Sequence, residues 1–272
     1  MLIEERRKQL LDLVSRRGFI SLADLARELR VSEATARRDL NYWRDYGVLK
    51  RIHGGAMYTG ENATLPSLEE RAHSQTSEKI RVARVAASRI RNGDTVLLDG
   101  GTTTLEVARF LAGRPVQVVT NSLPIATLLS STRETQLVFL GGSLYPSAGV
   151  VLGPLTIRAL ENIHVHQTIL SVAGITAKGL FNSNMLLVET ERRMMRCAEE
   201  VVVVADHTKI GRHGLAFLCK LSTIDTLIVD DGLTPEQRQL VENAGPRLII
   251  ASEPGNNTAG EPRDSGADGV HT

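Results

Sequence analysis

Residues 95–104 have the composition of an anion-binding turn. The apolar run 95–99 is typical of a buried strand, Gly100 and Gly101 permit a sharp turn, and threonines at 102–104 open a helix. Unpaired backbone N–H groups at a helix N-terminus attract anions, glycines let the backbone approach closely, and threonine hydroxyls add donors. We therefore predict a phosphate-binding turn. The alternative is an ordinary strand, turn and helix with threonine caps.

Polar residues also follow other apolar runs, at 120–122, 141–142 and 206–209. Ligands of open α/β sheets bind beyond the carboxyl ends of the strands, so these loops are expected to meet at one crevice. Arg71 and Lys79 lie eight residues apart on a preceding helix and can add positive charge to the same anion, although the pattern favours a solvated surface for both. The residues predicted to contact the anion are Arg71, Lys79, Asp99, Gly101, Thr102, Thr103, Thr104, Asn121, Asp206 and Lys209.

Residues 33–46 are predicted to form a helix with one apolar and one polar face. Its apolar face holds Ala36, Leu40 and Trp43 at i, i+4, i+7 spacing, and its polar face holds Thr35, Arg37, Arg38 and Asn41. The major groove of DNA admits one α-helix, in which arginine reads guanine and asparagine reads adenine. The pattern therefore predicts a DNA-reading helix. The alternative is that its arginines only solubilise an exposed helix.

The elements around this helix indicate a winged helix-turn-helix. A first helix stops near Gly18, Ser21 caps a second, and Ser32 caps the third after a short break. The run 48–55 alternates weakly and ends in glycines, as a short basic β-wing would. The residues predicted to contact DNA are Ser21, Ser32, Thr35, Arg37, Arg38, Asn41, Lys50, Arg51 and His53.

The rest of the chain predicts an α/β domain with a mostly parallel sheet, because seven short apolar runs alternate with helical patterns. The predicted strands are 95–99, 116–120, 136–140, 167–172, 201–205, 226–229 and 248–251. One helix is expected over 68–90, which holds no proline or glycine. The expected domains are a winged helix-turn-helix at 1–58, a linker at 59–66, the α/β domain at 67–252 and a disordered tail at 253–272.

Composition narrows the class of protein. Hydrophobic residues make up 42% and charged residues 23%, as in ordinary globular proteins. No apolar run approaches the roughly 18 residues of a membrane span, and the start lacks an apolar signal segment, so we expect a cytoplasmic protein without membrane contact. The spacing of Cys197 and Cys219 indicates neither a disulfide framework nor a metal site, and the pair His164 and His166 has no further ligands spaced for a metal. No metal or cofactor is therefore predicted. Residues 1–60 hold twelve Lys and Arg against eight Asp and Glu, which suits contact with phosphates.

Several segments carry a family resemblance. VSEATARRDL at 31–40 and RIHGGA at 51–56 resemble the DeoR family of bacterial sugar-metabolism regulators, and the similarity covers nearly the whole chain except the tail. The segments 99–104, 119–122 and 205–211 match as well. Ala36 stands where family members usually have a larger aliphatic residue, which leaves the polar face of the helix unaffected.

The resemblance implies an α/β domain similar to ribose-5-phosphate isomerase that binds phosphorylated sugars or their relatives. It implies phosphate binding by Gly101 to Thr104, hydroxyl recognition by Asp99 and Asn121, and a charged contact from Lys209, with Asp206 orienting Lys209 or binding a hydroxyl itself. We expect a repressor of carbohydrate-metabolism genes. Its expected partners are double-stranded operator DNA, a phosphorylated small-molecule effector that releases the operator, and further copies in a homo-oligomer, dimer or tetramer.

Two rival hypotheses remain at this point. An activator differs from a repressor only in the position of its operator. An enzyme, either a sugar-phosphate isomerase or a transferase fused to the DNA-binding domain, would need Asp99 or Asp206 as general base within reach of a substrate carbon.

Overall fold

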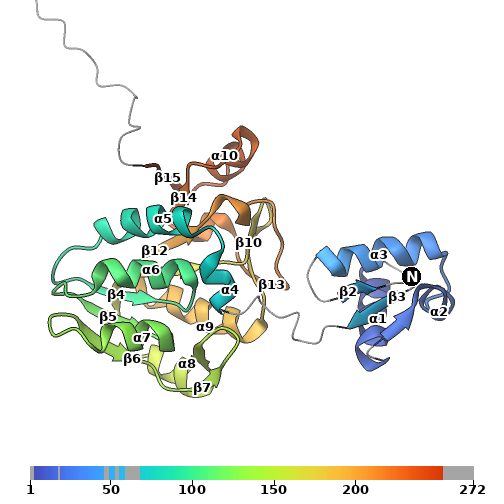
Figure 1. Ribbon diagram of the computed structural model, residues 1–272, viewed down its shortest axis with the longest axis horizontal. Coiled ribbons are helices and arrows are strands. Elements are labelled where there is room, and N and C mark those ends of the chain that lie inside the picture. Colours follow the sequence, from blue (N-terminus) through green and yellow to red (C-terminus); the bar gives the residue numbers. More distant parts are fainter. Residues whose placement is uncertain (1–2, 18, 46–48, 53–54, 59–67, 254–272) are drawn as a thin grey trace, which may run out of the picture.

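The computed structural model describes residues 3–17, 19–45, 49–52, 55–58 and 68–253. Its N-terminal part is a winged helix-turn-helix (Figure 1). The elements are α1 (Ile3–Arg17), β1 (Phe19–Ser21), α2 (Leu22–Glu28), α3 (Glu33–Asp45), β2 (Leu49–Ile52) and β3 (Gly55–Tyr58). Strand β3 pairs antiparallel with both β1 and β2, so the predicted wing is part of a three-stranded sheet. The three predicted helices and the hairpin are confirmed.

Local sequence explains the helix boundaries in this domain. Ser21 Oγ accepts the Asp24 N–H at 3.1 Å and caps α2, and Ser32 Oγ accepts the Thr35 N–H at 3.2 Å and caps α3. Between the two helices Arg30 has a φ of +53°, the left-handed conformation that ends many helices and turns the chain. The core beneath consists of Leu10, Val14, Ile20, Leu25, Ala26, Leu29, Ala36, Leu40, Leu49 and Ala56.

The larger part of the chain contains a seven-stranded parallel sheet. Its strands are β4 (Thr95–Leu98), β5 (Gln117–Thr120), β6 (Gln136–Phe139), β9 (Val165–Ser171), β12 (Ala198–Ala205), β14 (Thr226–Asp230) and β15 (Arg247–Ala251). Their order across the sheet is β15-β14-β12-β9-β4-β5-β6, and every ladder is parallel. All seven predicted strands are confirmed.

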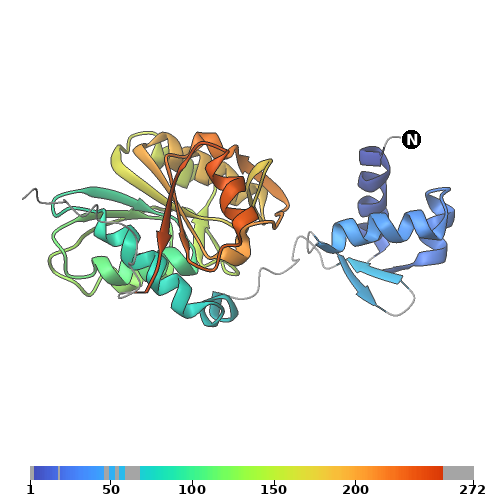
Figure 2. The same cartoon turned by 90° about the horizontal axis from the view of Figure 1, so that it is seen from above.

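Helices cover both faces of this sheet (Figures 1 and 2). They are α4 (Leu68–His73), α5 (Thr76–Ser88), α6 (Thr102–Leu111), α7 (Leu123–Leu129), α8 (Pro154–Leu160), α9 (Met185–Arg196) and α10 (Pro235–Glu242). Val96 and Leu98 of β4 pack with α5, α6 and α7, whereas Leu97 packs in the second core with α8, α9 and α10. Side chains alternate between the faces of a strand, so a strand buried on both faces is apolar throughout.

Several short elements were not predicted. β7 (Ser143–Tyr145) and β8 (Val150–Leu152) form a hairpin, and β10 (Gly174–Thr176), β11 (Gly179–Asn182) and β13 (Ala216–Cys219) form an antiparallel sheet. Two 3-10 turns, η1 (His207–Lys209) and η2 (Leu221–Thr223), complete the described elements. Strands of three or four residues are too short for an alternating pattern to stand out from its surroundings.

The single helix predicted over 68–90 is wrong. The chain breaks between α4 and α5, where Gln75 has a φ of +52°. The Lys79 ammonium donates to the backbone carbonyls of Arg71 and Ser74, which the break leaves without helical partners. Arg71 and Lys79 therefore do not share one helix, and Lys79 is buried instead of lying on a solvated surface.

The remaining sequence predictions fare differently. Residues 59–66 and 254–272 lie outside the described residues, so the linker and the disordered tail stay predictions. Cys197 is buried and Cys219 half-buried, and neither forms a disulfide. None of the described helices is long and apolar enough to cross a membrane.

Candidate functional site

Helix α3 presents an exposed cationic face. Arg37 and Arg38 are exposed on it, and Thr35 and Asn41 are half-buried. The Asn41 Oδ1 atom is buried with no hydrogen-bond partner among the described residues, so this side chain is less open to DNA than the arginines. The two guanidinium groups are therefore the side chains of α3 best placed to meet a duplex.

The opposite face of α3 is anchored as predicted. Ala36 and Leu40 are buried, and the indole N–H of Trp43 donates to the Arg7 carbonyl at 2.8 Å. Asp39 is a further anchor that sequence reasoning missed. Its carboxylate, 3% exposed, pairs with Arg6 Nε at 2.6 Å and with Arg7 Nε at 3.1 Å, which fixes α3 on α1. The hydrogen bond with Asp39 raises the pKa of Arg6.

The other predicted DNA contacts are described in part. Ser21 caps α2 and donates its hydroxyl to the Asp24 carboxylate at 2.6 Å, and the Ser32 and Thr35 hydroxyls lie 2.9 Å apart. Lys50 and Arg51 lie on β2, as the wing requires, but their side chains are outside the described part of the chain. His53 is also outside it. The role of each residue stays a prediction.

The sheet order places the candidate anion site between β4 and β9. Strands β5 and β6 extend from β4 toward one edge, and β12, β14 and β15 extend from β9 toward the other. Crossovers therefore reverse direction between β4 and β9. Open α/β sheets bind ligands beyond the carboxyl ends of the strands at such a point, and we call this region the crevice. Asp99 follows β4 there, and Ser171 ends β9. The predicted turn thus lies where α/β sheets bind ligands.

Asp99 is held tightly at this crevice. Its Oδ2 accepts the Ser171 N–H at 3.1 Å, and its Oδ1 accepts the Thr104 hydroxyl at 3.2 Å. Burial raises the pKa of Asp99 to about 7, against the opposing effect of these donors and of the Arg71 charge. The carboxyl group therefore changes its charge near neutral pH.

The turn itself is compact. Gly101 is the N-cap of α6 and packs so closely on β9 that a Cβ there would lie 2.0 Å from Ser171 Oγ. The Thr104 hydroxyl accepts the Gly101 N–H at 2.8 Å and donates to Asp99, so any contact of Thr104 with an anion is through its backbone. Thr102 and Thr103 are also buried. The N–H groups of a first helical turn have no intrahelical acceptor and stay available to an anion.

Three cations gather at this edge. Burial lowers the pKa of both Lys79 and Lys209, and the charge of Arg71 lowers both further. Asp206 opposes this effect on each lysine. The pKa of Arg71 is also lowered by burial, and the charge of Asp99 opposes that. The structure thus brings the three predicted cations within electrostatic reach of one another.

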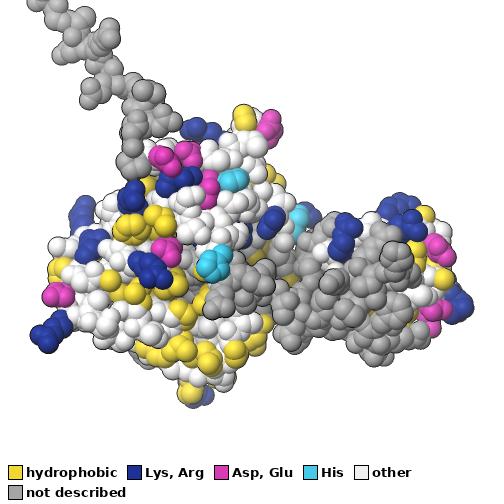
Figure 3. Space-filling view, viewed as in Figure 1, with side chains coloured by type: hydrophobic (Ala, Val, Ile, Leu, Met, Phe, Trp, Pro, Cys, Tyr) yellow, Lys and Arg dark blue, Asp and Glu magenta, His cyan; other side chains and the backbone are white. Residues whose placement is uncertain are grey.

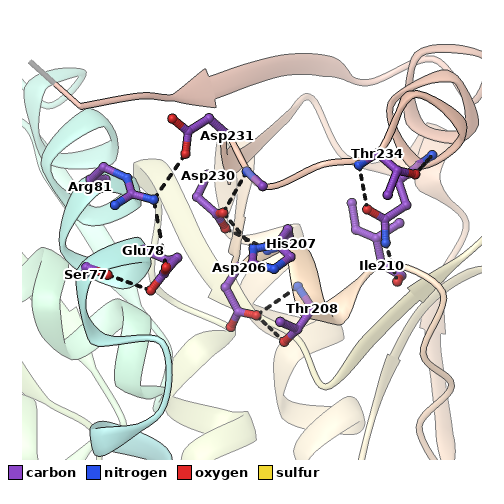
Figure 4. A network of polar contacts seen from close by, with 12 residues as sticks. Ser77, Glu78, Arg81, Asp206, His207, Thr208, Ile210, Asp230, Asp231 and Thr234 are labelled. Carbon is purple, nitrogen blue, oxygen red and sulfur yellow. Dashed lines mark hydrogen bonds and ion pairs between the residues drawn. The ribbon is translucent and has the colours of Figure 1, made fainter. Parts of the chain in front are cut away.

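The loop after β12 is fixed by a network of polar contacts (Figure 4). Asp206 accepts the Thr208 N–H at 3.1 Å and the Thr208 hydroxyl. The His207 backbone N–H donates to Asp230 Oδ1 at 2.7 Å, and His207 Nδ1 lies 2.7 Å from Asp230 Oδ2. Asp230 ends β14 and is fully buried, so it holds in place the turn that carries Lys209.

The same network joins α5 to the loop after β14 (Figure 4). Arg81 of α5 lies 3.1 Å from Asp231 and 4.0 Å from Glu78. The residues around the two lysines are therefore positioned by strands and helices far apart in the sequence, which local patterns do not reveal.

Two buried polar side chains of the α/β domain, one predicted and one missed, have an oxygen without a hydrogen-bond partner among the described residues. Asn121, predicted from the sequence, donates its Nδ2 to the Val151 carbonyl at 3.1 Å, whereas its Oδ1 has no hydrogen-bond partner among the described residues. Glu191 of α9 was missed, because nothing in its local sequence indicates burial. It is 4% exposed, and its Oε2 likewise lacks a partner in that part of the chain.

No metal centre is found in the part of the chain that the structure describes: it holds no group of three or more His, Cys, Asp or Glu placed to bind a metal. His164 is largely exposed and lies 3.0 Å from Glu199, and His166 Nδ1 accepts the Thr95 N–H at 3.1 Å. The two histidines are ordinary surface and strand residues.

The chain combines a winged helix-turn-helix that exposes arginines with an α/β domain that has buried polar groups at the ends of its strands. This combination defines the class of DNA-binding transcription regulators that carry a sensor domain. The family model of the DeoR-like helix-turn-helix domain matches residues 6–61, and that of the DeoR C terminal sensor domain matches residues 74–231. The second match covers more than half of the chain. The chain belongs to the DeoR family, which confirms the resemblance seen in the sequence.

Similar proteins agree with this class. The HTH-type transcriptional regulator UlaR of Escherichia coli (strain SMS-3-5 / SECEC) is 29% identical over 90% of this chain and 98% of its own length, and the same values hold for UlaR of Salmonella arizonae.

Two solved structures show only a distant likeness. Ribose 5-phosphate isomerase A from Methanocaldococcus jannaschii is 18% identical, covers 50% of this chain and 55% of its own, and has a TM-score of 0.38. The eIF2B beta structure from Chaetomium thermophilum is 11% identical, covers 84% of this chain and 85% of its own, and has a TM-score of 0.40. At such TM-scores neither likeness carries an argument about function.

Proposed function

We propose that this chain is a repressor of carbohydrate-metabolism genes. It binds double-stranded operator DNA through α3 and the β2–β3 wing, and it leaves the operator when a phosphorylated sugar or a related metabolite binds at the crevice between β4 and β9. The observation that carries the proposal is that Arg71, Lys79 and Lys209 lie within electrostatic reach of one another, and that the charges of Asp99 and Asp206 act on them.

The physical reason is that partly buried like charges repel one another. Burial and mutual repulsion both disfavour the cationic form of the two lysines, as their lowered pKa indicates. A phosphate dianion offsets this cost and accepts hydrogen bonds from charged donors, while the first turn of α6 adds backbone N–H groups. An effector that binds one conformation of the regulator more tightly than another can then change the affinity of the regulator for DNA.

We propose that the crevice senses its ligand and does not turn it over. The Asp206 carboxylate already accepts both hydrogen bonds of Thr208, and Asp99 accepts from Ser171 and Thr104, so both candidate bases are engaged in holding loops. The relatives named above are transcriptional regulators.

We also propose that the chain acts as a cytoplasmic homo-oligomer, dimer or tetramer. Two-fold operators match dimeric helix-turn-helix proteins. Figure 3 shows hydrophobic side chains gathered on the lower part of the larger domain, over α7, β6 and β7. β6 is an edge strand without a charged residue, and Val138 and Phe139 on it are 39% and 42% exposed, as at an interface between copies. Sedimentation of the full chain tests this point, and a monomer at micromolar concentration contradicts it.

The main experiment measures DNA binding and ligand release together. Duplexes that bind the full chain are selected from a random library, and the affinity for the selected site is measured with and without a panel of sugar phosphates. Turnover of each compound is followed in the same samples. Release without turnover is the expected result. Turnover of a compound that is lost in Asp99→Asn would favour the hypothesis of an enzyme. If no compound releases the DNA, the hypothesis of a sensor is contradicted.

A matched pair of variants tests the DNA-reading face. Arg38→Ala is expected to weaken binding to the selected site by about 5- to 150-fold, corresponding to the loss of one bidentate base contact, with an unchanged thermal melt. Arg44→Ala removes the same charge from the far end of α3 and is expected to weaken binding less. An equal loss by Arg38→Ala on random DNA would mean that Arg38 only contacts phosphate.

A further inference from the structure

Glu191 is a buried carboxyl group of the α/β domain to which the sequence assigned no role. It lies in the middle of α9, which packs against β9 and β11. Its Oε1 accepts the Asn182 Nδ2–H at 2.5 Å, and its Oε2 is buried with no hydrogen-bond partner in the described ranges. Leaving a buried polar atom unpaired costs about 1–3 kcal/mol, so this atom calls for an explanation.

The position of Glu191 joins it to the proposed effector site. Ser171 holds Asp99 and Asn182 holds Glu191, and the chain just after Ser171 lies beside the residue just before Asn182, because the Ala173 N–H donates to the Phe181 carbonyl at 3.0 Å. Burial raises the pKa of Glu191 well above the usual range, and the charge of Asp99 raises it further. Asp99 accepts from Ser171 and Thr104, whereas Glu191 accepts only from Asn182. The carboxyl group that accepts more hydrogen bonds keeps the charge, so Asp99 is the carboxylate of the pair and Glu191 holds the proton.

The chemistry of this pair suits a hydroxyl group. Oε1 of Glu191 already accepts a hydrogen bond, so the proton lies on Oε2, which then needs an acceptor. A hydroxyl accepts from one group and donates to another, and it can therefore bridge a protonated carboxyl and a carboxylate.

We propose that Glu191 recognises a hydroxyl group of the effector through Oε2, with Asn182 as a positioning residue. The ligand class is a phosphorylated sugar or polyol, whose phosphate lies at the first turn of α6 and whose hydroxyls reach Asp99 and Glu191. The proposal rests on the proposed function, since it needs a ligand anchored by its phosphate.

The test compares two ligands on the full chain by calorimetry. The probes are inorganic phosphate and the sugar or polyol phosphate that binds most tightly in a panel. Glu191→Met is expected to leave the affinity for inorganic phosphate unchanged and to weaken the sugar phosphate about tenfold. Glu189→Gln, on the exposed side of the same helix, is the control and is expected to change neither affinity.

The outcomes separate this inference from the proposed function. An unchanged preference for the sugar phosphate in Glu191→Met overturns the inference alone, and a water molecule is then the partner of Oε2. Failure of the wild type to bind any phosphate compound overturns both. If Glu191→Met does not fold, deoxy analogues of the sugar phosphate are measured on the wild type. One of them is expected to bind about tenfold more weakly, and a change below threefold for all of them overturns the inference.

Discussion

Gly101→Ala tests how closely the anion-binding turn packs on the sheet. A Cβ at this position would lie 2.0 Å from Ser171 Oγ and 2.8 Å from Ser171 Cβ. Carbon atoms in good contact lie about 3.5–4.0 Å apart, so the turn and the end of β9 must separate by roughly 0.7 Å or more. Overpacking of this kind costs about 1–3 kcal/mol, and we expect the free energy of unfolding of the α/β domain to fall by that amount.

The assay is urea unfolding followed by far-UV circular dichroism. Trp43 is the single tryptophan of the chain and lies in the winged helix-turn-helix, so its fluorescence reports that domain separately and should not change. Gly141→Ala is the matched control, because a Cβ there meets no atom within 4 Å, and we expect a change below about 0.5 kcal/mol.

A second substitution identifies the contact responsible. Ser171→Gly removes the two atoms closest to the new Cβ, so the double variant should lose at least about 1 kcal/mol less than the sum of the two single losses. Strictly additive losses, or a Gly101→Ala chain as stable as Gly141→Ala, would refute the close packing of α6 on β9.

Two further predictions concern buried carboxyl groups. Asp39→Asn should destabilise the winged helix-turn-helix by about 1–3 kcal/mol, because it breaks the ion pairs with Arg6 and Arg7. Urea unfolding followed by Trp43 fluorescence measures this loss, and an unchanged unfolding midpoint would contradict the prediction. Burial raises the pKa of Asp99 to about 7, so its ionisation costs stability as the pH rises from about 4 to 7. Asp99→Asn should therefore gain up to about 4 kcal/mol over the wild type between pH 4 and pH 8, and a difference that does not vary with pH would show that Asp99 is not buried as described.

The sequence predicted much of the fold because local signals were strong. The serine caps of α2 and α3 and the apolar stripe of α3 follow from hydrogen bonding and helical spacing within a few residues. The central strands of the parallel sheet contain continuous apolar segments, such as Val96 to Leu98 and Val201 to Ala205, because both of their faces are buried. The break before α5 was missed because Lys79, a later residue in the chain, supplies the donors that make it stable.

What the sequence determined by itself is which polar side chains stand at the ends of strands and which face of α3 carries the arginines. The tertiary structure alone decided which strands are neighbours, and β9 beside β4 brings Ser171 to Asp99 across 72 residues. The burial of Glu191 was also decided there, because the environment of a carboxyl group depends on what packs against it and not on its neighbours in the chain. Local patterns set the elements, but the charges that meet at a site depend on how those elements are arranged.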